Sequence, residues 1–428
     1  MELLERLKSE LEGVEAAGHS DFAHLESDVT GFLDRLKQHE LQYPEPVFAV
    51  LRRIKPVLIV KNVALITRFA DVQDALARVD VFQVTYGEKM RLVTGGRDFF
   101  LGMQNSPEYE RDVAHMRTVV RRSDISGIVV PFVSTTACAL VEEANGKLDV
   151  VSGLARVVPT RLIGAYFGCK PTSEADLAVW GSTLFQYLFT DLTNDPAVGA
   201  AAADAAAHVR DWLDGLISEA KATDPATRPD TVLTRCLALQ GLPGMDDIGI
   251  RNNLLGLLIG EIPTTSKCCA QALDELLKRP DQLALAQQAA RTGDDATFAQ
   301  YVFEALRFNP NNPGVFRVAA ADYVVGSGQP HATSIPKGCS VLPATQSAMF
   351  DEDVIEDASE FKVGRPAWNY MHWGSGLHTC FGQYINQVQI PGILKPLLQR
   401  NNLRRADGDP GTLQYAGPFP CSLNVLFD

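Results

Sequence analysis

The stretch Trp373-Gly374-Ser375-Gly376-Leu377-His378-Thr379-Cys380-Phe381-Gly382 is followed at once by a helical pattern from Gln383 to Arg400. Glycines at 374 and 376 allow backbone conformations with positive φ and let the main chain come close to a flat ligand. The backbone N–H groups of such a loop, together with the positive end of the helix that follows, favour the deprotonated form of Cys380. The stretch therefore predicts a loop that wraps a large ligand and presents one cysteine as a thiolate.

A thiolate held in this way is the axial ligand that biases a haem iron toward cleavage of the O–O bond. The stretch resembles the haem-binding loop of the cytochrome P-450 superfamily, an aromatic residue followed by Gly-x-Gly-x-His-x-Cys-x-Gly. Trp373 stands where that family most often has Phe, which keeps an aromatic ring beside the sulfur. The resemblance spans roughly residues 45–428 and implies haem b as the cofactor, with Cys380 as the iron ligand. It also implies a mainly α-helical fold with small β-sheets (α+β), in which one long helix crosses the haem.

The composition bounds the class of protein. With 428 residues, 46% of them hydrophobic, the chain can bury a large core. Its formal net charge of −13 argues against a nucleic-acid partner, because binding to phosphates needs clustered Lys and Arg. The eight cysteines are scattered without Cys-x-x-Cys pairs, which is typical of a reducing compartment and not of a disulfide framework or a zinc site.

No targeting or membrane segment is predicted. The N-terminus has the pattern of a charged amphipathic helix and lacks the apolar core of a signal peptide. No run approaches the roughly 18 apolar residues of a membrane span. We therefore expect a cytoplasmic protein without a membrane anchor. One catalytic domain is expected over residues 1–428, with a helical extension at residues 1–45.

Apolar periodicity, prolines and capping residues predict the elements around the loop. Residues 1–45 are expected to be helical, with Pro44 and Pro46 closing the segment, and two short strands are expected between residues 47 and 69. Residues 82–92 are expected to form a loop whose aromatic residues, Phe82 and Tyr86, could line a pocket. Further helices are expected at 71–79, from Ser106-Pro107 onward, twice within 129–167, at 174–190, at 197–221, from 244 to about 278, and at 298–308.

The resemblance implies further haem-binding residues. Arg117 is the best-placed candidate for one haem propionate, although the family often has a His four residues earlier and this chain has Val113. Arg317 stands where the family places a second propionate ligand, and the planar fork of an arginine suits a carboxylate. His378 is expected to donate to a propionate and not to act as a catalyst. The other loop residues expected to contact the haem are Trp373, Gly374, Gly376 and Gly382.

Glu304 and Arg307 are three residues apart on one face of a predicted helix. That spacing alone indicates no more than a weak surface pair. However, the pair also resembles the Glu-x-x-Arg helix of the family, and Arg365 fills the place of the third member in the stretch before the loop. These three residues are therefore expected to be structural.

In the family's monooxygenases the long helix carries an acid followed by an alcohol where it passes the iron, and the two relay protons to bound dioxygen. This chain has Gly260-Glu261-Ile262-Pro263-Thr264-Thr265 there. Thr264 keeps the alcohol, Pro263 takes the place of the acid, and Glu261 lies beside Thr264 at helical spacing. Pro263 is expected to kink or open the helix and to free the carbonyl of Ile259. Thr264 and Glu261 are the expected catalytic residues, with burial raising the pKa of the carboxyl.

Three functions remain open from the sequence. The first is a monooxygenase that inserts one oxygen atom from dioxygen into a small apolar substrate, with Thr264, water and Glu261 carrying protons. The second uses a peroxide or rearranges a hydroperoxide without an electron donor, because loss of the standard acid is a departure known among such relatives. The third is a non-catalytic haem protein that senses or carries a ligand.

A monooxygenase would need electrons from another protein. The chain has no Gly-x-Gly-x-x-Gly after a strand and no cysteines spaced for an iron–sulfur cluster. A ferredoxin with its reductase is the expected donor, and Arg111 and Arg121 are candidate residues near its docking face. The substrate stays open, since an apolar pocket fits fatty acids, terpenoids, steroids and aromatic metabolites equally well.

Overall fold

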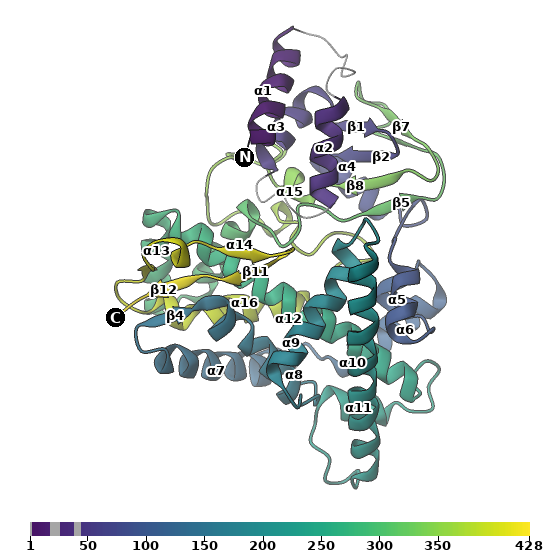
Figure 1. The fold of residues 1–428 in the computed structure, drawn as a ribbon, viewed down its shortest axis with the longest axis vertical. Coiled ribbons are helices and arrows are strands. Elements are labelled where there is room, and N and C mark those ends of the chain that lie inside the picture. The colour runs from purple at the N-terminus through teal and green to yellow at the C-terminus, as the bar shows by residue number, and fades with distance from the viewer. Residues whose placement is uncertain (1, 18–25, 38–43) are drawn as a thin grey trace. The chain divides into compact units, whose positions relative to one another are not determined.

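The structure is a computed structural model that describes residues 2–17, 26–37 and 44–428. Most of these residues are helical and the strands form small sheets, as predicted (Figure 1). The chain divides into two compact units, residues 1–85 with 306–380 and residues 86–305 with 381–428. One boundary falls inside helix α14 (Asp295–Phe308), and another directly follows Cys380. The single catalytic domain expected from the sequence stays a prediction.

The first unit contains a five-stranded sheet with the strand order β1-β2-β8-β5-β3. Strand β2 pairs in parallel with β8, and the other neighbours are antiparallel. A separate pair is formed by β6 (Tyr323–Val325) and β7 (Thr333–Ile335). The strands of the larger sheet are β1 (Val57–Val60), β2 (Val63–Ile66), β3 (Phe82–Gln83), β5 (Arg317–Ala319) and β8 (Ser340–Pro343). β1 and β2 are the two strands predicted between residues 47 and 69.

Two apolar clusters hold the first unit together. One joins residues of the sheet to helix α4 (Phe69–Ala77). The other joins strands β1, β2 and β8 to three N-terminal helices, α1 (Glu2–Ala17), α2 (Glu26–Lys37) and α3 (Glu45–Ile54). The helical prediction for residues 18–25 and 38–43 lies outside the described residues. A short helix, α15 (Thr345–Ala348), interrupts the irregular segment that follows β8.

Two sequence predictions in the N-terminal region are wrong. Pro44 and Pro46 do not close a helix but begin one, since Pro44 is the N-cap of α3 and Pro46 lies in its first turn. Proline costs no hydrogen bond there, because the first N–H groups of a helix have no partner within it. The loop expected at residues 82–92 instead contains β3 and most of helix α5 (Gly87–Thr94).

The second unit is organised around α12 (Asp247–Leu277), which has 31 residues. Asp246 caps its N-terminus by accepting a hydrogen bond from the Gly249 N–H at 2.8 Å. α12 packs against α8 (Val157–Ala165), α9 (Glu174–Phe185), α10 (Pro196–Ala222) and α16 (Gln383–Leu398). The predicted long helix is therefore confirmed, and it lies at the centre of its unit.

The remaining elements of the second unit surround this core. Ser106 caps α6 (Pro107–Val119), as the sequence predicts. A three-stranded sheet has the order β4-β12-β9, and β10 pairs with β11. The other bounds are α7 (Val130–Glu143), α11 (Val232–Ala238), α13 (Pro280–Thr292), β4 (Lys147–Asp149), β9 (Arg404–Arg405), β10 (Gln414–Ala416), β11 (Phe419–Ser422) and β12 (Asn424–Leu426).

The sequence prediction that no segment is long and apolar enough to span a membrane is wrong for one helical segment. Within the described residues, the helical segment Ile125–Glu143 is long and apolar enough to cross a membrane, by length and composition only. The segment includes α7, which packs against α8 and α16 in this unit. Length and composition alone do not make this segment a span.

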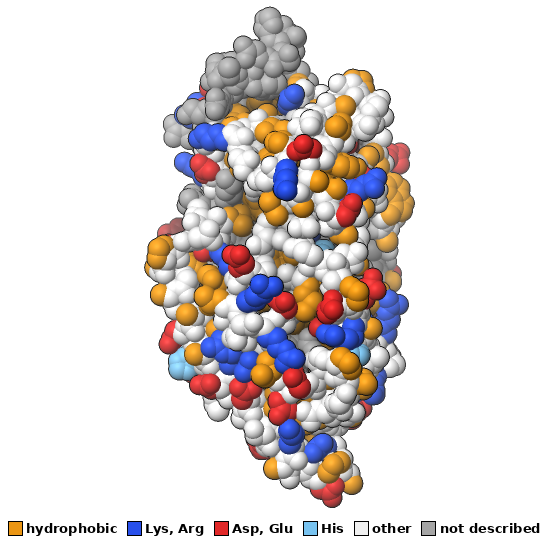
Figure 2. Space-filling view, turned by 90° about the vertical axis from the view of Figure 1, so that its right-hand side faces the viewer, with side chains coloured by type: hydrophobic (Ala, Val, Ile, Leu, Met, Phe, Trp, Pro, Cys, Tyr) orange, Lys and Arg blue, Asp and Glu red, His pale blue; other side chains and the backbone are white. Residues whose placement is uncertain are grey.

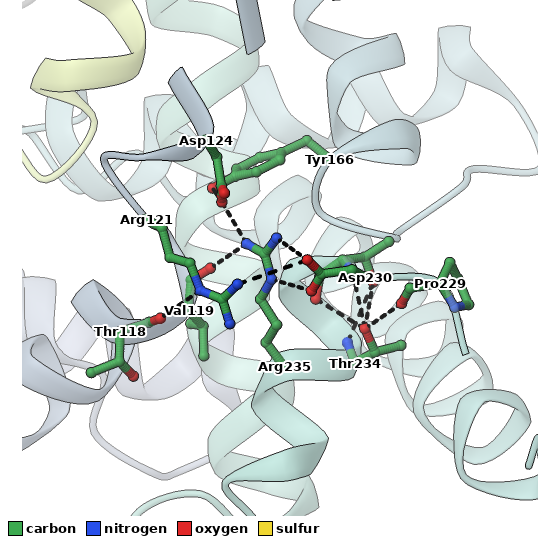
Figure 3. A network of polar contacts seen from close by, with 10 residues as sticks. Thr118, Val119, Arg121, Asp124, Tyr166, Pro229, Asp230, Thr234 and Arg235 are labelled. Atoms are coloured by element: carbon green, nitrogen blue, oxygen red, sulfur yellow. Dashed lines mark hydrogen bonds and ion pairs between the residues drawn. The ribbon is translucent and has the colours of Figure 1, made fainter. Parts of the chain in front are cut away.

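A network of polar contacts around the buried Arg235 joins several segments of the second unit (Figure 3). Arg235 on α11 donates to Asp124 at 2.5 Å, to Asp230 at 2.5 and 2.8 Å, and to the Val119 carbonyl at 2.9 Å. Tyr166, the C-cap of α8, donates to the same Asp124 oxygen at 2.9 Å. Burial and this hydrogen bond raise the pKa of Tyr166. The network therefore fixes the ends of α6 and α8 to α11.

Figure 2 shows one face of the molecule, on which Lys and Arg side chains lie among Asp and Glu side chains. Ion pairs of the second unit include Arg91–Asp98, Arg97–Asp246, Lys221–Asp247 and Arg251–Asp214. Charges paired in this way cancel locally, unlike the clustered Lys and Arg that phosphate binding needs.

Candidate functional site

The predicted thiolate loop ends the first unit. The Cys380 N–H donates to the Trp373 carbonyl at 2.8 Å, and the Thr379 N–H donates to the Gly376 carbonyl at 3.1 Å, so the loop closes on itself. Gly374 and Gly376 have φ values of 71° and 74°. A Cβ at position 376 would also come 2.8 Å from the carbonyl oxygen of Leu76. Both the backbone conformation and this close approach require glycine at 376.

Cys380 is half-buried at the end of this loop, three residues before the first residue of α16. Other cysteines are enclosed in apolar surroundings. Burial raises the pKa of Cys169 and Cys269, and it raises the pKa of Cys236 to about 12. These three side chains therefore stay thiols, whereas a metal ligand must be a thiolate. Among the described cysteines, the position of Cys380 in a closed glycine loop suits that role best.

Arg317 and His378 are neighbours within the first unit. Arg317 begins β5 and is buried, and one of its N–H groups donates to the Phe316 carbonyl at 2.8 Å. Burial, and then the positive charge of Arg317, lowers the pKa of His378 to about 4. A bound carboxylate would offset the positive charge that is gathered here. The donor set fits an anionic group such as a haem propionate, and the roles of both residues stay predictions.

Arg117 lies on α6, against the residue that follows Cys380. It donates to the Phe381 carbonyl at 2.9 Å, and its guanidinium carbon is 3.9 Å from the centroid of the Phe381 ring. The Tyr384 ring centroid is 5.5 Å away. These contacts hold the start of α16 to α6 within the second unit. The predicted contact of Arg117 with a propionate stays a prediction.

Gly382 differs from the other glycines of the motif. It is the N-cap of α16 and has φ −78° and ψ 1°, a conformation open to any residue. Unlike those of Gly374 and Gly376, its backbone conformation does not require glycine. Its predicted contact with the haem is therefore the one that the local structure supports least.

Arg307 and Arg365 converge on one backbone carbonyl of the first unit. Arg307 is fully buried and donates to the carbonyls of Met349, Ala358 and Glu360 at 2.6 to 3.0 Å. Arg365 donates to the same Glu360 carbonyl at 3.0 Å, and to those of Glu356 and Asp357 at 2.6 Å. Glu304, one turn earlier on α14, is fully buried as well. The two arginines therefore organise the irregular segment before the thiolate loop.

One stripe of α12 is not buried. Between Asn252 and Leu276 every residue is buried except Leu257, Gly260 and Thr264. Their spacing of three and four residues places them on one face of the helix. A Cβ at position 260 would meet no atom within 4 Å, and the Thr264 hydroxyl donates to the Gly260 carbonyl. The stripe therefore leaves room for a ligand beside Thr264.

Pro263 does not open α12, so that part of the sequence prediction is wrong, and the kink stays a prediction. The helix runs unbroken from Asp247 to Leu277. A Cβ built on Gly181 of α9 would lie 3.9 Å from the Pro263 ring, so α9 packs closely there. The Ile259 carbonyl still loses its usual partner four residues on, because proline has no N–H.

Glu261 faces the contact between α12 and α16. It is 5% exposed, and burial raises its pKa to about 7, with Gln389 of α16 moderating the rise. No hydrogen bond of good geometry joins the two side chains, since the Oε1 atom of Glu261 and both polar atoms of Gln389 are buried without partners among the described residues. Burial, and then the charges of Cys268 and Glu261, raise the pKa of Cys269. The expected raised pKa is present, but this placement does not support proton transfer between Glu261 and Thr264.

We expect Glu261→Gln to change how stability depends on pH. Because the pKa of Glu261 rises from 4.5 to about 7 on folding, the native state holds this proton more tightly than the unfolded state. The stabilisation is fully present below about pH 4.5 and is lost as the pH rises through about 7. Between these limits the free energy of unfolding of the variant, relative to wild type, should rise by up to about 3 kcal/mol. Denaturant unfolding at several pH values measures this difference.

The exposed Glu143, changed to Gln, is the matched control for the loss of one carboxylate. Turnover of Glu261→Gln should stay within about threefold of wild type, because a proton-transfer group would contribute about 100-fold or more. A pH-independent difference for Glu261→Gln would contradict the account of a buried, neutral acid.

Comparison with known proteins relates these features to one family. A family model described as Cytochrome P450 matches residues 184–416, more than half of the chain. The steroid C26-monooxygenase of Mycolicibacterium smegmatis is 27% identical over 286 residues, which are 66% of this chain and 68% of that protein. A bifunctional dioxygenase–epoxy alcohol synthase of Fusarium oxysporum is 24% identical over 358 residues, which cover 70% of this chain and 27% of that protein.

Among solved structures, a ligand-free cytochrome P450 of Mycobacterium smegmatis has a TM-score of 0.77 and 20% sequence identity. The match covers 92% of this chain and 99% of that chain. This likeness confirms the predicted mainly helical fold with small sheets. The chain spans about a quarter of the bifunctional relative, so the activity of that whole protein does not carry over with the match.

Proposed function

Because the chain belongs to the cytochrome P450 family, we propose that it inserts one oxygen atom from dioxygen into an apolar organic substrate, with electrons from a ferredoxin and its reductase. The family members are oxidoreductases that bind protoporphyrin IX haem through a cysteine thiolate, and this chain is a haem-thiolate enzyme. Cys380 would hold the iron, and Arg317 and His378 would hold a propionate. The bound haem supplies the activation of dioxygen.

The half-buried stripe of α12 carries this proposal. Thr264 lies on it, with its hydroxyl donating to the Gly260 carbonyl. That hydroxyl can still accept a hydrogen bond from water, because a hydroxyl has one donor and two acceptor sites. Gly260 leaves room for such a water molecule beside the helix. Thr264 is therefore placed to hold water and to pass a proton along this face.

The electron donor is proposed from the chemistry and not from a docking surface. Arg111 and Arg121 are the candidate residues for its docking, but both have acidic neighbours in the structure. Arg111 donates to Asp112 at 2.8 Å, and Arg121 lies 3.7 Å from Asp230. Their charges are partly offset by these partners, so they support the proposed docking face only weakly.

A second candidate function is the use of a hydroperoxide without an electron donor. Pro263 takes the place of the acid that the family's monooxygenases use, so one proton carrier is missing from α12. Two relatives are named bifunctional dioxygenase–epoxy alcohol synthases. An epoxy alcohol can form from an unsaturated hydroperoxide when one oxygen atom moves within the molecule. In this case the enzyme would act on a peroxide that another enzyme supplies.

Thr264→Ala distinguishes these two candidates. If Thr264 passes protons to activated dioxygen, the product formed per electron pair should fall at least about tenfold. Loss of a proton-transfer group can cost about 10²- to 10⁴-fold. The electrons would then appear as hydrogen peroxide, and the haem content would be unchanged. Product yield and donor consumption, measured together, give this ratio.

The matched control is Thr264→Ser, which keeps the hydroxyl and should keep most of the coupling between electrons and product. Normal coupling in Thr264→Ala would contradict the proposed role of the hydroxyl. An unchanged rate with a hydroperoxide, without any donor, would favour the second candidate.

A further inference from the structure

Lys267 is a mostly buried lysine that has no charged partner among the residues that the structure describes. It lies on α12 and is 7% exposed, and its amino group makes no hydrogen bond or ion pair with the residues that the structure describes. Burial lowers its pKa to about 8. Two buried arginines, by contrast, have carboxylate partners, since Arg52 pairs with Glu45 at 2.7 Å and Arg235 pairs with Asp124 at 2.5 Å. An uncompensated buried charge is costly, so such a group points to a ligand of opposite charge.

Its position on α12 connects Lys267 with the half-buried stripe. Residues 257, 260, 264 and 267 are separated by three, four and three positions, so Lys267 continues the line of Leu257, Gly260 and Thr264. Its Cα lies about 4.5 Å along the helix axis from that of Thr264. Helical side chains lean toward the N-terminus of their helix, so the lysine side chain leans over the turn that contains Thr264.

A row of aromatic rings lies on elements of the same unit. Tyr86 contacts Phe189 with ring centroids 4.8 Å apart, Phe189 contacts Phe185 at 4.7 Å, and Phe185 contacts Phe419 at 5.7 Å. Phe185 belongs to α9 and Phe419 to β11, and α12 packs against both elements. Apolar surface and one unpartnered cation therefore occur on elements that are packed together.

We propose that Lys267 binds the carboxylate of an apolar acid, and that the substrate is a fatty-acid-type molecule whose chain lies against the aromatic row. This inference rests on the proposed function, since it takes the Thr264 stripe to be where the substrate is held. A carboxylate supplies the charge partner that Lys267 lacks, and the aromatic rings suit a hydrocarbon chain. A neutral steroid or terpenoid would leave the buried ammonium group uncompensated.

Binding of three probes tests the proposal. The haem-loaded protein is titrated with hexadecanoic acid, its methyl ester and hexadecan-1-ol, and dissociation constants are measured by equilibrium dialysis and by the shift of the haem absorption. The acid should bind at least about tenfold more tightly than the ester, because hydrogen bonds to charged groups contribute about 1.5 to 3 kcal/mol. Lys267→Met should remove this preference while leaving the affinity for the ester within about twofold.

Two controls separate ligand binding from structure. Lys221→Met removes an exposed lysine that pairs with Asp247 at 2.9 Å, and it should leave the preference for the acid unchanged. The unfolding midpoint of Lys267→Met should not fall, because methionine has a similar length and no charge to bury. Lys267→Gln provides a second neutral side chain if the Met variant does not fold.

Two results would overturn the proposal. One is a wild-type protein that binds the acid no more tightly than the ester, and the other is a neutral variant at position 267 that keeps the full preference for the acid. Binding needs neither dioxygen nor an electron donor, so this test can succeed even if the proposed oxygen insertion fails.

Discussion

Cys380→Ser is expected to abolish the thiolate spectrum of the haem and the catalytic activity. The characteristic absorption of the carbon monoxide complex of the reduced protein should be lost, since serine does not supply a thiolate. Turnover should fall at least about 100-fold, because losing even an outer partner of a metal ligand costs about 10- to 100-fold. Absorption spectra and product assays on the same preparation measure both effects.

Cys421→Ser is the matched control, because Cys421 is an exposed cysteine on β11 of the second unit. Its spectrum and turnover should equal those of wild type. Retention of the thiolate spectrum in Cys380→Ser would refute the ligand assignment and, with it, the function proposed for the loop.

Arg307→Met is expected to lower the free energy of unfolding by about 3 to 5 kcal/mol, the range for removing one partner of a buried charged interaction. Arg307 is fully buried, and its fork holds the carbonyls of Met349, Ala358 and Glu360. Methionine would leave these acceptors without their donor in the segment that leads to the thiolate loop. Denaturant unfolding gives the change in stability, and haem content reports the effect on the loop.

The control for this change is Arg78→Met. Arg78 is exposed in the same unit and pairs with Asp74 at 3.3 Å, so its loss should cost less than about 1 kcal/mol. An Arg307 variant as stable as the Arg78 variant would contradict the structural role of Arg307.

Features governed by local chemistry could be predicted from the sequence. Gly374 and Gly376 adopt the positive φ that the motif indicates, and Ser106 caps the helix that begins at Pro107. The long helix also begins within a few residues of the predicted start at 244, and Asp246 caps it. Each of these depends on neighbours in the chain, so the sequence alone contains the necessary information.

Features that depend on tertiary neighbours could not be predicted from the sequence. In an isolated helix, the spacing of Glu261 and Thr264 places them near each other. The spacing cannot show that α16 packs over the side chain of Glu261. Pro263 was expected to open α12, and the packing of α9 at Gly181 was not visible in the sequence. For the same reason Pro44 and Pro46 could close one helix or begin the next, because proline suits both places.

Lys267 is a residue that the sequence interpretation missed. A lysine three positions after Thr264, in a helix whose centre is mostly apolar, was a visible signal. Its significance depends on the absence of a partner, and that requires the positions of the surrounding side chains. Many lysines in helices extend their amino groups to water, so the pattern alone does not distinguish this one.

The central claim, that the enzyme inserts oxygen from dioxygen, is tested most directly by isotope tracing. The purified haem protein is incubated under ¹⁸O-labelled dioxygen with fatty acids, terpenoids, other lipids and fatty-acid hydroperoxides, with and without a ferredoxin and its reductase. Mass spectrometry then locates the oxygen in each product. The account predicts one labelled atom per product molecule, and only when electrons are supplied. Unlabelled product formed from a hydroperoxide without a donor would contradict it.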